Sequence, residues 1–306
     1  MKVYYAPTHL QPLPDGHRFP MGKYALLKKG VQEHWPDIEQ IQASPATPGE
    51  LALVHDTDYI HAVMHGELET AHQREIGFPW SEGMVKRALA SVGASVMAAR
   101  TALIEGISGN MAGGTHHAAR GRGGGFCVFN DVAVAARLMA VEAKRQGAHG
   151  FRVAIVDLDV HQGNGTALIF KDDPSVYTIS LHGAKNFPFR KEQSDLDIEL
   201  PDGCNDEYYW EQLDRALKHL EQQGHFDMVF YLAGVDPHAQ DRLGRLGLSE
   251  QGLSVRDERV FQWARARQTP LTFAMAGGYG PSMEHTVQLQ LNTFGHALRA
   301  WREWQA

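Results

Sequence analysis

The chain has 306 residues, of which 43% are hydrophobic and 21% are charged, so it can bury a large core and lacks the composition of a disordered protein. Its 29 basic and 36 acidic residues give a net charge of −7, which argues against a broad nucleic-acid-binding face but allows an acidic pocket for a cationic substrate. The two cysteines, Cys127 and Cys204, have no CxxC partner, which fits a reducing compartment better than a disulfide framework. No signal-peptide pattern follows Met1, and no apolar run reaches the ~18 residues of a membrane span, so we expect a cytoplasmic protein without a membrane partner.

Short apolar runs alternate with longer amphipathic segments along the chain. The runs predict strands at the N-terminus, at 110–112 and at 153–156, 176–179, 228–232 and 271–275, and the amphipathic segments predict helices at 82–106, 129–147, 205–223, 249–266 and 281–303. Continuous apolar runs suit strands that are buried on both faces. The sequence therefore predicts a single α/β domain over residues 1–306, with a mostly parallel central sheet and helices on both faces.

Glycines and polar residues follow four of the expected strands, at the point where each strand ends. The four segments are Gly113-Gly114-Thr115-His116-His117, Asp157-Leu158-Asp159-Val160-His161, Ala233-Gly234-Val235-Asp236 and Gly277-Gly278-Tyr279-Gly280. Glycine lets the backbone turn sharply and approach a ligand closely. In open α/β sheets ligands bind at the carboxyl ends of the strands, so we expect these segments to meet in one active site.

Asp157, Asp159 and His161 are candidates for a metal site. Side chains at i, i+2 and i+4 of a strand share one face, so these three would crowd one spot at a cost in repulsion and desolvation unless a cation is present. Oxygen and nitrogen ligands without a thiolate suit catalytic zinc, and Asp236 is the natural third ligand from another strand end. The alternative is a polar turn that caps the next helix. The second acidic strand end favours the metal site.

The pair His116-His117 and Tyr279 are candidates for the catalytic groups. An imidazole near a metal-bound water can act as general base, and it needs an orienting acceptor, for which Asp157 and Asn164 are candidates. A tyrosine hydroxyl in a glycine-rich loop could stabilise an oxyanion. The alternatives are a purely structural histidine pair and an aromatic ring packed in a turn.

Aromatic residues on two loops could form a narrow apolar slot for an extended methylene chain. One loop is Gly123-Gly124-Gly125-Phe126-Cys127, and the other is Asn186-Phe187-Pro188-Phe189. Ordinary core packing is the alternative for both. We expect Cys127 to be a small buried residue rather than a nucleophile.

Taken together, these segments resemble the zinc-dependent histone deacetylases and their bacterial relatives, which have the arginase/deacetylase fold. The matching motifs occur in the order of that family and span most of the chain: GGTHHA at 113–118, GGGFCVFND at 123–131, DLDVHQGNGT at 157–166, ISLH at 179–182, AGVDPHAQDRLGRLGLS at 233–249 and AGGYG at 276–280. The segment HRFPMGKY at 17–24 and the pair Gln162 and Asn164 most resemble the class IV branch.

The resemblance implies a role for each matching residue. The zinc ligands would be Asp159, His161 and Asp236. His117 would be the main general base and then acid, His116 would orient the water, and Tyr279 would bind the carbonyl oxygen. Asp157 would bond to His116 and Asn164 to His117; many family members have aspartate at the latter position, which puts a charge relay to His117 in doubt.

The resemblance also implies a substrate channel and a second cation. The channel would contain Gly125, Phe126, Phe187 or Phe189, and Leu243, with Arg18 near its inner end. A potassium ion would lie close to the zinc, partly on backbone carbonyls, among Asp157, Asp159, His161, Ser180 and Leu181.

The function expected from the resemblance is metal-assisted hydrolysis of an N-acyl-lysine amide, with an acetyl or longer acyl group. Three alternatives stay open. The first is the same chemistry on an acetylated polyamine or another acylated amine, which the net negative charge favours only weakly. The second is an arginase-like hydrolase with two manganese ions, and the third is a non-catalytic module that binds acyl-lysine. Oligomeric state is not determined by the sequence.

Overall fold

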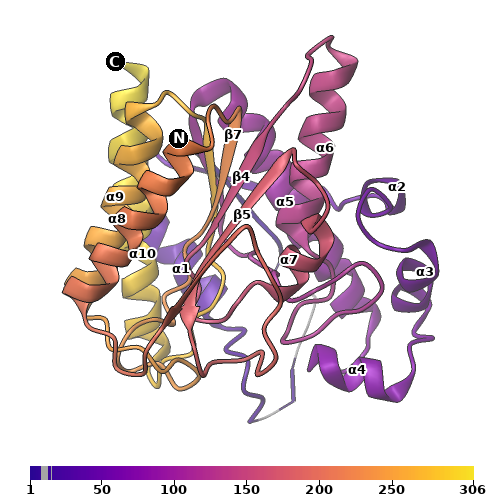
Figure 1. Ribbon diagram of the computed structural model, residues 1–306. Coiled ribbons are helices and arrows are strands. Elements are labelled where there is room, and N and C mark those ends of the chain that lie inside the picture. The colour runs from indigo at the N-terminus through magenta and orange to yellow at the C-terminus, as the bar shows by residue number, and fades with distance from the viewer. Residues whose placement is uncertain (8–12, 15) are drawn as a thin grey trace.

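Figure 1 shows the computed structural model, which describes residues 1–7, 13–14 and 16–306. An eight-stranded sheet forms its centre, with strand order β2-β1-β3-β8-β7-β4-β5-β6 and parallel pairing between all neighbours. The strands are β1 (Lys2–Tyr5), β2 (Glu39–Gln42), β3 (Ile107–Asn110), β4 (Val153–Asp157), β5 (Val176–Gly183), β6 (Leu196–Leu200), β7 (Met228–Leu232) and β8 (Leu271–Ala274). The predicted parallel α/β fold is confirmed.

Helices cover both faces of the sheet, as the sequence predicts. One layer contains α1, α8, α9 and α10, and the other contains α5 and α6, with the short helices α2, α3 and α4 outside it (Figure 1). The helices are α1 (Lys23–His34), α2 (Pro48–Leu51), α3 (Thr57–His65), α4 (Thr70–Ile76), α5 (Glu82–Glu105), α6 (Asp131–Arg145), α7 (Asn164–Phe170), α8 (Asp206–Gln222), α9 (Glu250–Ala266) and α10 (Met283–Gln305). Both chain ends lie in the upper half of Figure 1, away from the carboxyl ends of the strands.

The five long helices begin where a short polar side chain can replace the missing backbone partner. The capping side chains accept a hydrogen bond from the backbone N–H three residues further on, and they are Ser81, Asn130, Asn205, Ser249 and Ser282. Such a cap contributes about 1 kcal/mol. These caps explain why the predicted starts of all five helices agree with the structure to within two residues.

Helix α5 is long and apolar enough to cross a membrane, judged by length and composition. However, 67% of its apolar 18-residue window is buried within the protein. Its small residues let it approach neighbouring backbone closely: a Cβ added at Gly93 would lie 1.8 Å from the carbonyl oxygen of Ser44. We therefore interpret α5 as a core helix.

Two parts of the sequence prediction differ from the structure. The strand before the His116-His117 pair is β3, which ends at Asn110, so the expected strand at 110–112 lies three residues too late. Helices α1–α4 and α7 and the edge strands β2 and β6 were not predicted. Both edge strands are partly exposed and carry alternating polar residues, so they lack the apolar run that marks a buried strand.

Candidate active site

The four glycine-rich and polar segments follow β3, β4, β7 and β8, which are neighbours in the sheet. The chain leaves β4 toward β5 on one side and leaves β7 toward β8 on the other, so the order of connections reverses between β4 and β7. Ligands bind at such a switch point in open α/β sheets. Asp159 and His161 follow β4, and Asp236 follows β7.

Asp159, His161 and Asp236 form a buried cluster whose potential ligand atoms all lie within 4.8 Å of one another. Nδ1 of His161 lies 2.9 Å from Oδ1 of Asp159 and 3.2 Å from Oδ2 of Asp236. Asp157 is not in the cluster. The three residues expected to be zinc ligands are therefore brought together as the sequence suggests.

The expected reason for this convergence is wrong. Strand β4 ends at Asp157, so Asp159 and His161 are not on one face of an extended strand. Instead, the segment turns after Asp157, because the N–H of Asp159 donates to Oδ1 of Asp157 (3.1 Å) and that of His161 donates to Oδ1 of Asp159 (2.9 Å). These side-chain-to-backbone bonds, which compete with regular structure, aim the ligands into the site.

Backbone amides of neighbouring loops orient the two carboxylates. The N–H of Gly277 donates to Oδ2 of Asp159 at 2.7 Å, and the N–H of Val160 donates to Oδ1 of Asp236 at 2.9 Å. Oδ2 of Asp236 is buried, and no described residue donates a hydrogen bond to it, because Nδ1 of His161, 3.2 Å away, is hydrogen-bonded to Oδ1 of Asp159 instead. A buried carboxylate oxygen without a partner is costly, so it indicates a cation that the protein does not itself supply.

The charges of the cluster also fit a cation. Burial raises the pKa of Asp236, and the neighbouring Asp159 adds to the effect, so this pKa is about 7 despite the opposing charge of His161. Burial alone would lower the pKa of His161, but its hydrogen bond to Asp159 and the negative charges of Asp159 and Asp236 outweigh burial and raise this pKa to about 10. Without a metal, protons thus occupy a site whose donors suit a divalent ion. There is also no room for a larger residue than Gly277, whose added Cβ would lie 1.8 Å from Oδ2 of Asp236.

His116 and His117 lie side by side in the loop after β3, with ring centroids 4.2 Å apart, and each has a different partner. Nδ1 of His116 is 2.6 Å from Oδ2 of Asp157, and Nδ1 of His117 is 2.7 Å from Oδ1 of Asn164. These are the two pairings that the sequence predicts. If the amide oxygen of Asn164 accepts, Nδ1 of His117 carries the proton and its Nε2 is free to accept another.

The surroundings of the two imidazoles shift their pKa values in opposite directions. Burial would lower the pKa of His116, but the negative charges of Asp157 and Asp159 outweigh it and raise this pKa to about 9. Burial, together with His116 and His161, lowers the pKa of His117 well below its ordinary value. One imidazolium beside one neutral imidazole is an arrangement that can divide acid and base roles.

Tyr279 faces the same site from the loop after β8. Its ring centroid lies 6.4 Å from that of His161. Burial, followed by the charges of Asp159 and Asp236, raises the pKa of Tyr279 well above its ordinary value, so its hydroxyl stays protonated and can donate a hydrogen bond. Its N–H donates to Oδ2 of Asp241 at 2.6 Å, and its carbonyl accepts from Nε of Arg242 at 2.8 Å. Hydrogen bonds to both the N–H and the carbonyl oxygen of Tyr279 thus fix the backbone of the glycine-rich loop.

A cleft of about 760 Å³ opens above His117, His161 and Tyr279. All six residues expected in the substrate channel line it: Arg18, Gly125, Phe126, Phe187, Phe189 and Leu243. A Cβ added at Gly125 would lie 2.5 Å from Cδ2 of His117, so only glycine permits this approach. The Phe187 ring meets His117 edge-on at 4.9 Å, whereas Phe189 is 88% exposed at the rim. Of the two phenylalanines left open by the sequence, Phe187 lies beside the catalytic candidates.

The expected position of Arg18 is wrong. Arg18 is exposed and lines the outer cleft, whereas the inner end of the site is a small cavity of about 40 Å³ that Arg18 does not touch. The guanidinium at this cavity belongs to Arg87 of α5, which is only 8% exposed. Nε of Arg87 has no hydrogen-bond partner among the described residues. The sequence offered no signal for Arg87, because its helix reads as an ordinary apolar one.

Comparison with known proteins now identifies the family. Residues 17–293 match the model of the histone deacetylase domain. The chain belongs to the histone deacetylase family. A protein of Picosynechococcus sp. with no characterised function is 43% identical over 93% of this chain and 94% of its own length. Histone deacetylase 2 of Arabidopsis thaliana is 30% identical over 86% of this chain and 68% of its own.

Other histone deacetylase relatives agree with this assignment. The acetoin utilization protein AcuC of Bacillus subtilis is 30% identical over 73% of this chain and 61% of its own. Among solved structures, a histone deacetylase homologue in complex with SAHA has a TM-score of 0.78 at 22% identity, over 99% of this chain and 89% of its own. A homologue from Aquifex aeolicus has a TM-score of 0.77 at 22% identity, over 98% of this chain and 88% of its own. These structures match the fold, and the family makes the protein a hydrolase of the deacetylase type.

Several supporting residues of this histone deacetylase family member were not predicted. Arg256 of α9 is fully buried and donates to the carbonyl oxygens of Gly234 (2.5 Å) and Leu158 (3.4 Å), so it links the loops that carry the metal candidates. Asp131 accepts from the N–H groups of Gly114 and Thr115, which fixes the loop before His116. Lys23 is fully buried and donates to the carbonyl oxygen of Gly278 at 3.1 Å, next to Tyr279. Asp131 and Lys23 lie within motifs that carry the resemblance, which was the only available signal.

Proposed function

We propose that this protein is a zinc-dependent deacylase that hydrolyses the amide of an N-acyl-lysine side chain. The observation that carries the proposal is the partnerless Oδ2 of Asp236 within a buried Asp–His–Asp cluster, on the floor of a cleft that His117 and Tyr279 also line. Asp159, His161 and Asp236 would hold the zinc ion. Family membership supports both the metal and the reaction type.

A bound zinc ion would polarise the amide carbonyl and lower the pKa of a water molecule toward 7. Nε2 of His117 takes the proton from that water as its oxygen adds to the carbonyl carbon. The Tyr279 hydroxyl donates to the oxygen that becomes negative. His117 then gives the proton to the amine nitrogen as the C–N bond breaks, and a carboxylate and a free amine result. Asn164 orients His117, and Asp157 keeps His116 positively charged beside the reacting atoms.

A second cation is part of the proposal. Asp157 of β4 pairs in register with Ser180 of β5, and Leu181 follows directly. We propose that these residues, together with Asp159 and His161, bind a potassium ion, partly through backbone carbonyls.

We also propose that the protein is cytoplasmic.

Substitution of Tyr279 by phenylalanine tests the oxyanion role. The variant keeps the aromatic ring and both backbone bonds to Asp241 and Arg242, so we expect it to fold normally. Loss of one oxyanion donor lowers kcat by about 10²–10³. Steady-state kinetics on an acetyl-lysine peptide measure the effect, with circular dichroism and zinc content as controls. Near-wild-type kcat would remove Tyr279 from the mechanism.

The inner cavity gives an expectation for the acyl group. Its volume of about 40 Å³ has room for about three water molecules, so it accepts an acetyl group but not a chain of a dozen carbons. Overpacking costs about 1–3 kcal/mol, which corresponds to roughly a 5- to 160-fold loss. We expect kcat/KM for an acetyl-lysine peptide to exceed that for the same peptide with a dodecanoyl group by this factor. Equal or faster long-chain turnover would contradict the assigned depth of the pocket.

The alternatives predict other results. An arginase-like enzyme needs side-chain ligands for two manganese ions, and among the described residues Asp159, His161 and Asp236 are the one cluster of three or more His, Cys, Asp or Glu side chains that could hold a metal. Two manganese ions per chain in metal analysis would favour that alternative. A non-catalytic acyl-lysine-binding module would bind the peptide without turnover after zinc is restored. A polyamine deacetylase would turn over N-acetylspermidine faster than any acetyl-lysine peptide.

A further inference from the structure

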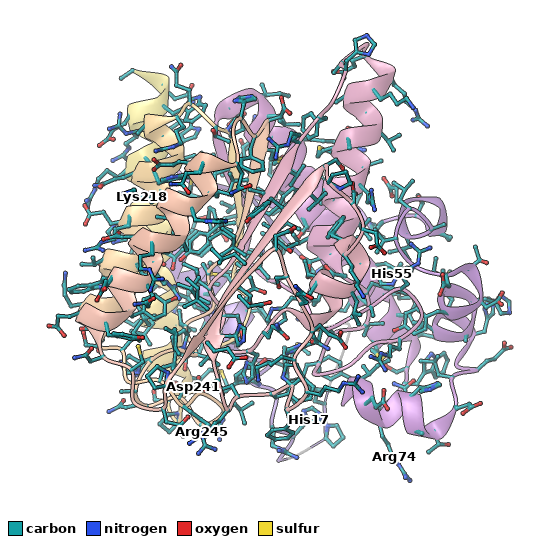
Figure 2. All side chains as sticks on the ribbon, viewed as in Figure 1. His17, His55, Arg74, Lys218, Asp241 and Arg245 are labelled. Atoms are coloured by element: carbon teal, nitrogen blue, oxygen red, sulfur yellow. The ribbon has the colours of Figure 1, made fainter. Side chains whose placement is uncertain are left out.

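The mouth of the cleft has a charge opposite to that of the whole protein. The net charge of the chain is −7, yet the charged residues that line the cleft within the described part of the chain, histidine aside, are four cations and one anion: Arg18, Lys185, Arg242, Arg245 and Glu75. All five side chains lie on exposed residues at the carboxyl-terminal edge of the sheet. Arg245 and His17 lie at this lower edge in Figure 2, opposite the two chain ends.

Arg242 is the cation closest to the catalytic candidates. Its Nε donates to the carbonyl oxygen of Tyr279, which fixes the guanidinium at the side of the cleft. The neighbouring Asp241 does not pair with it directly, because its carboxylate faces the backbone and accepts from the N–H groups of Tyr279, Leu243 and Gly244 at 2.6–3.0 Å. Among the described residues, the ion pairs at this rim join Asp202 to Lys185 and Arg245, and none involves Arg242. Arg242 is exposed, so an incoming anion can reach its terminal nitrogens.

Lys185 and Arg245 share one carboxylate. Nζ of Lys185 is 3.6 Å from Oδ2 of Asp202, and Nη2 of Arg245 is 3.1 Å from the same oxygen. Two cations on one anion leave a net positive charge, and their side chains are 72% and 54% exposed. Asp202 keeps both side chains at the rim and offsets only one of their two positive charges.

We propose that this cationic rim, defined as Arg18, Lys185, Arg242 and Arg245, binds acidic residues that flank the acyl-lysine of a peptide substrate. The proposal rests on the proposed deacylase function and names its substrate class. An acylated polyamine keeps at least one ammonium group, which the rim repels, whereas aspartate or glutamate beside the lysine meets opposite charge within a Debye length of about 8–10 Å. A cleft of about 760 Å³ that is open to solvent also has room for a peptide segment rather than a small amine alone.

The test compares three substrates on the zinc-loaded protein: acetyl-lysine peptides with aspartate and glutamate flanks, the same peptides with lysine and arginine flanks, and N-acetylspermidine. Fields of this kind change association by 10-fold or more. We expect the acidic peptide to bind at least about tenfold more tightly than the basic one by fluorescence anisotropy, and its kcat/KM to be higher by a similar factor. The difference should shrink in 0.5 M salt, since the Debye length is then about 4 Å.

A pair of double variants locates the effect. In Lys185→Glu/Arg245→Glu we expect the acidic peptide to lose its advantage through a higher KM and Kd. Lys218→Glu/Arg145→Glu changes the total charge equally on exposed positions of α8 and of the last turn of α6, far from the cleft (Figure 2 labels Lys218). This control should keep the preference.

Each result decides between the possibilities. The proposed role of the rim is wrong if the wild type binds the basic peptide or N-acetylspermidine more tightly than the acidic peptide. It is also wrong if Lys185→Glu/Arg245→Glu keeps the preference for the acidic peptide, or if the control variant loses that preference equally. A short DNA duplex that displaces the acidic peptide more strongly than unlabelled peptide does would also contradict this role. Absence of turnover with the acidic preference in binding intact would instead reject the deacylase function and leave the rim standing.

Discussion

Replacement of Asp236 by asparagine is expected to abolish zinc binding and turnover while the protein stays folded. Asparagine can keep the oxygen that accepts the N–H of Val160, and it changes only the partnerless Oδ2 into an amide nitrogen. That nitrogen carries hydrogens and does not ligate zinc. Because Lewis-acid activation contributes several kcal/mol, we expect kcat/KM to fall by at least about 10³-fold.

Metal analysis and thermal unfolding check this result together. In the wild type, zinc at about 100 times its Kd stabilises the fold by about 2.7 kcal/mol, so the unfolding temperature should rise on loading and fall with a chelator. In Asp236→Asn neither addition should change it. His161 keeps Asp159 as a carboxylate partner at 2.9 Å in this variant, so we expect the metal-free variant to stay folded. A variant with one zinc per chain and wild-type turnover would exclude Asp236 as a ligand.

Replacement of His117 by alanine is expected to lower kcat by about 10²–10⁴ with zinc content unchanged. Its imidazole is not in the metal cluster, and its Nδ1 contacts Asn164 rather than a carboxylate. Binding of a substrate peptide to the variant, measured by anisotropy, should therefore persist while hydrolysis is lost.

A matched variant separates the base from its partner. Asn164→Ala removes the acceptor at 2.7 Å but leaves His117 in place, so we expect a smaller loss than in His117→Ala. Equal losses would mean that orientation rather than proton transfer limits the reaction. Wild-type turnover in His117→Ala would assign the base to another residue, with His116 the first candidate.

Most of the fold followed from sequence patterns that are long and strongly periodic. The continuous apolar runs of β4 and β7 and the capped helices α8 and α9 leave little ambiguity. Helices α2–α4 have only four to nine residues, and α1 contains a glycine whose added Cβ would lie 2.9 Å from Leu291. The formation of these helices depends on tertiary packing, which the periodicity of a single sequence does not indicate.

The site was predictable where its residues lie at the ends of strands and not where they support it from helices. Asp159, His161 and Asp236 follow β4 and β7 directly. Arg256 and Arg87, in contrast, look like ordinary surface residues in sequence, although they are 0% and 8% exposed. The net charge also gave no guide to the charge of the cleft. A total of −7 does not indicate how charges are distributed over the surface, and most charged residues that line the mouth of the cleft are cations.

The buried arginine of α9 has a consequence for how the metal enters and leaves. Arg256 links the loops after β4 and β7, and backbone amides orient Asp159 and Asp236, so protein hydrogen bonds alone connect the ligand-bearing loops. The ligands are preorganised, so metal exchange needs little rearrangement of the backbone. Unlike a zinc finger, which is unfolded without metal, this protein would be an apo-stable template whose catalysis can be removed and restored by metal exchange alone.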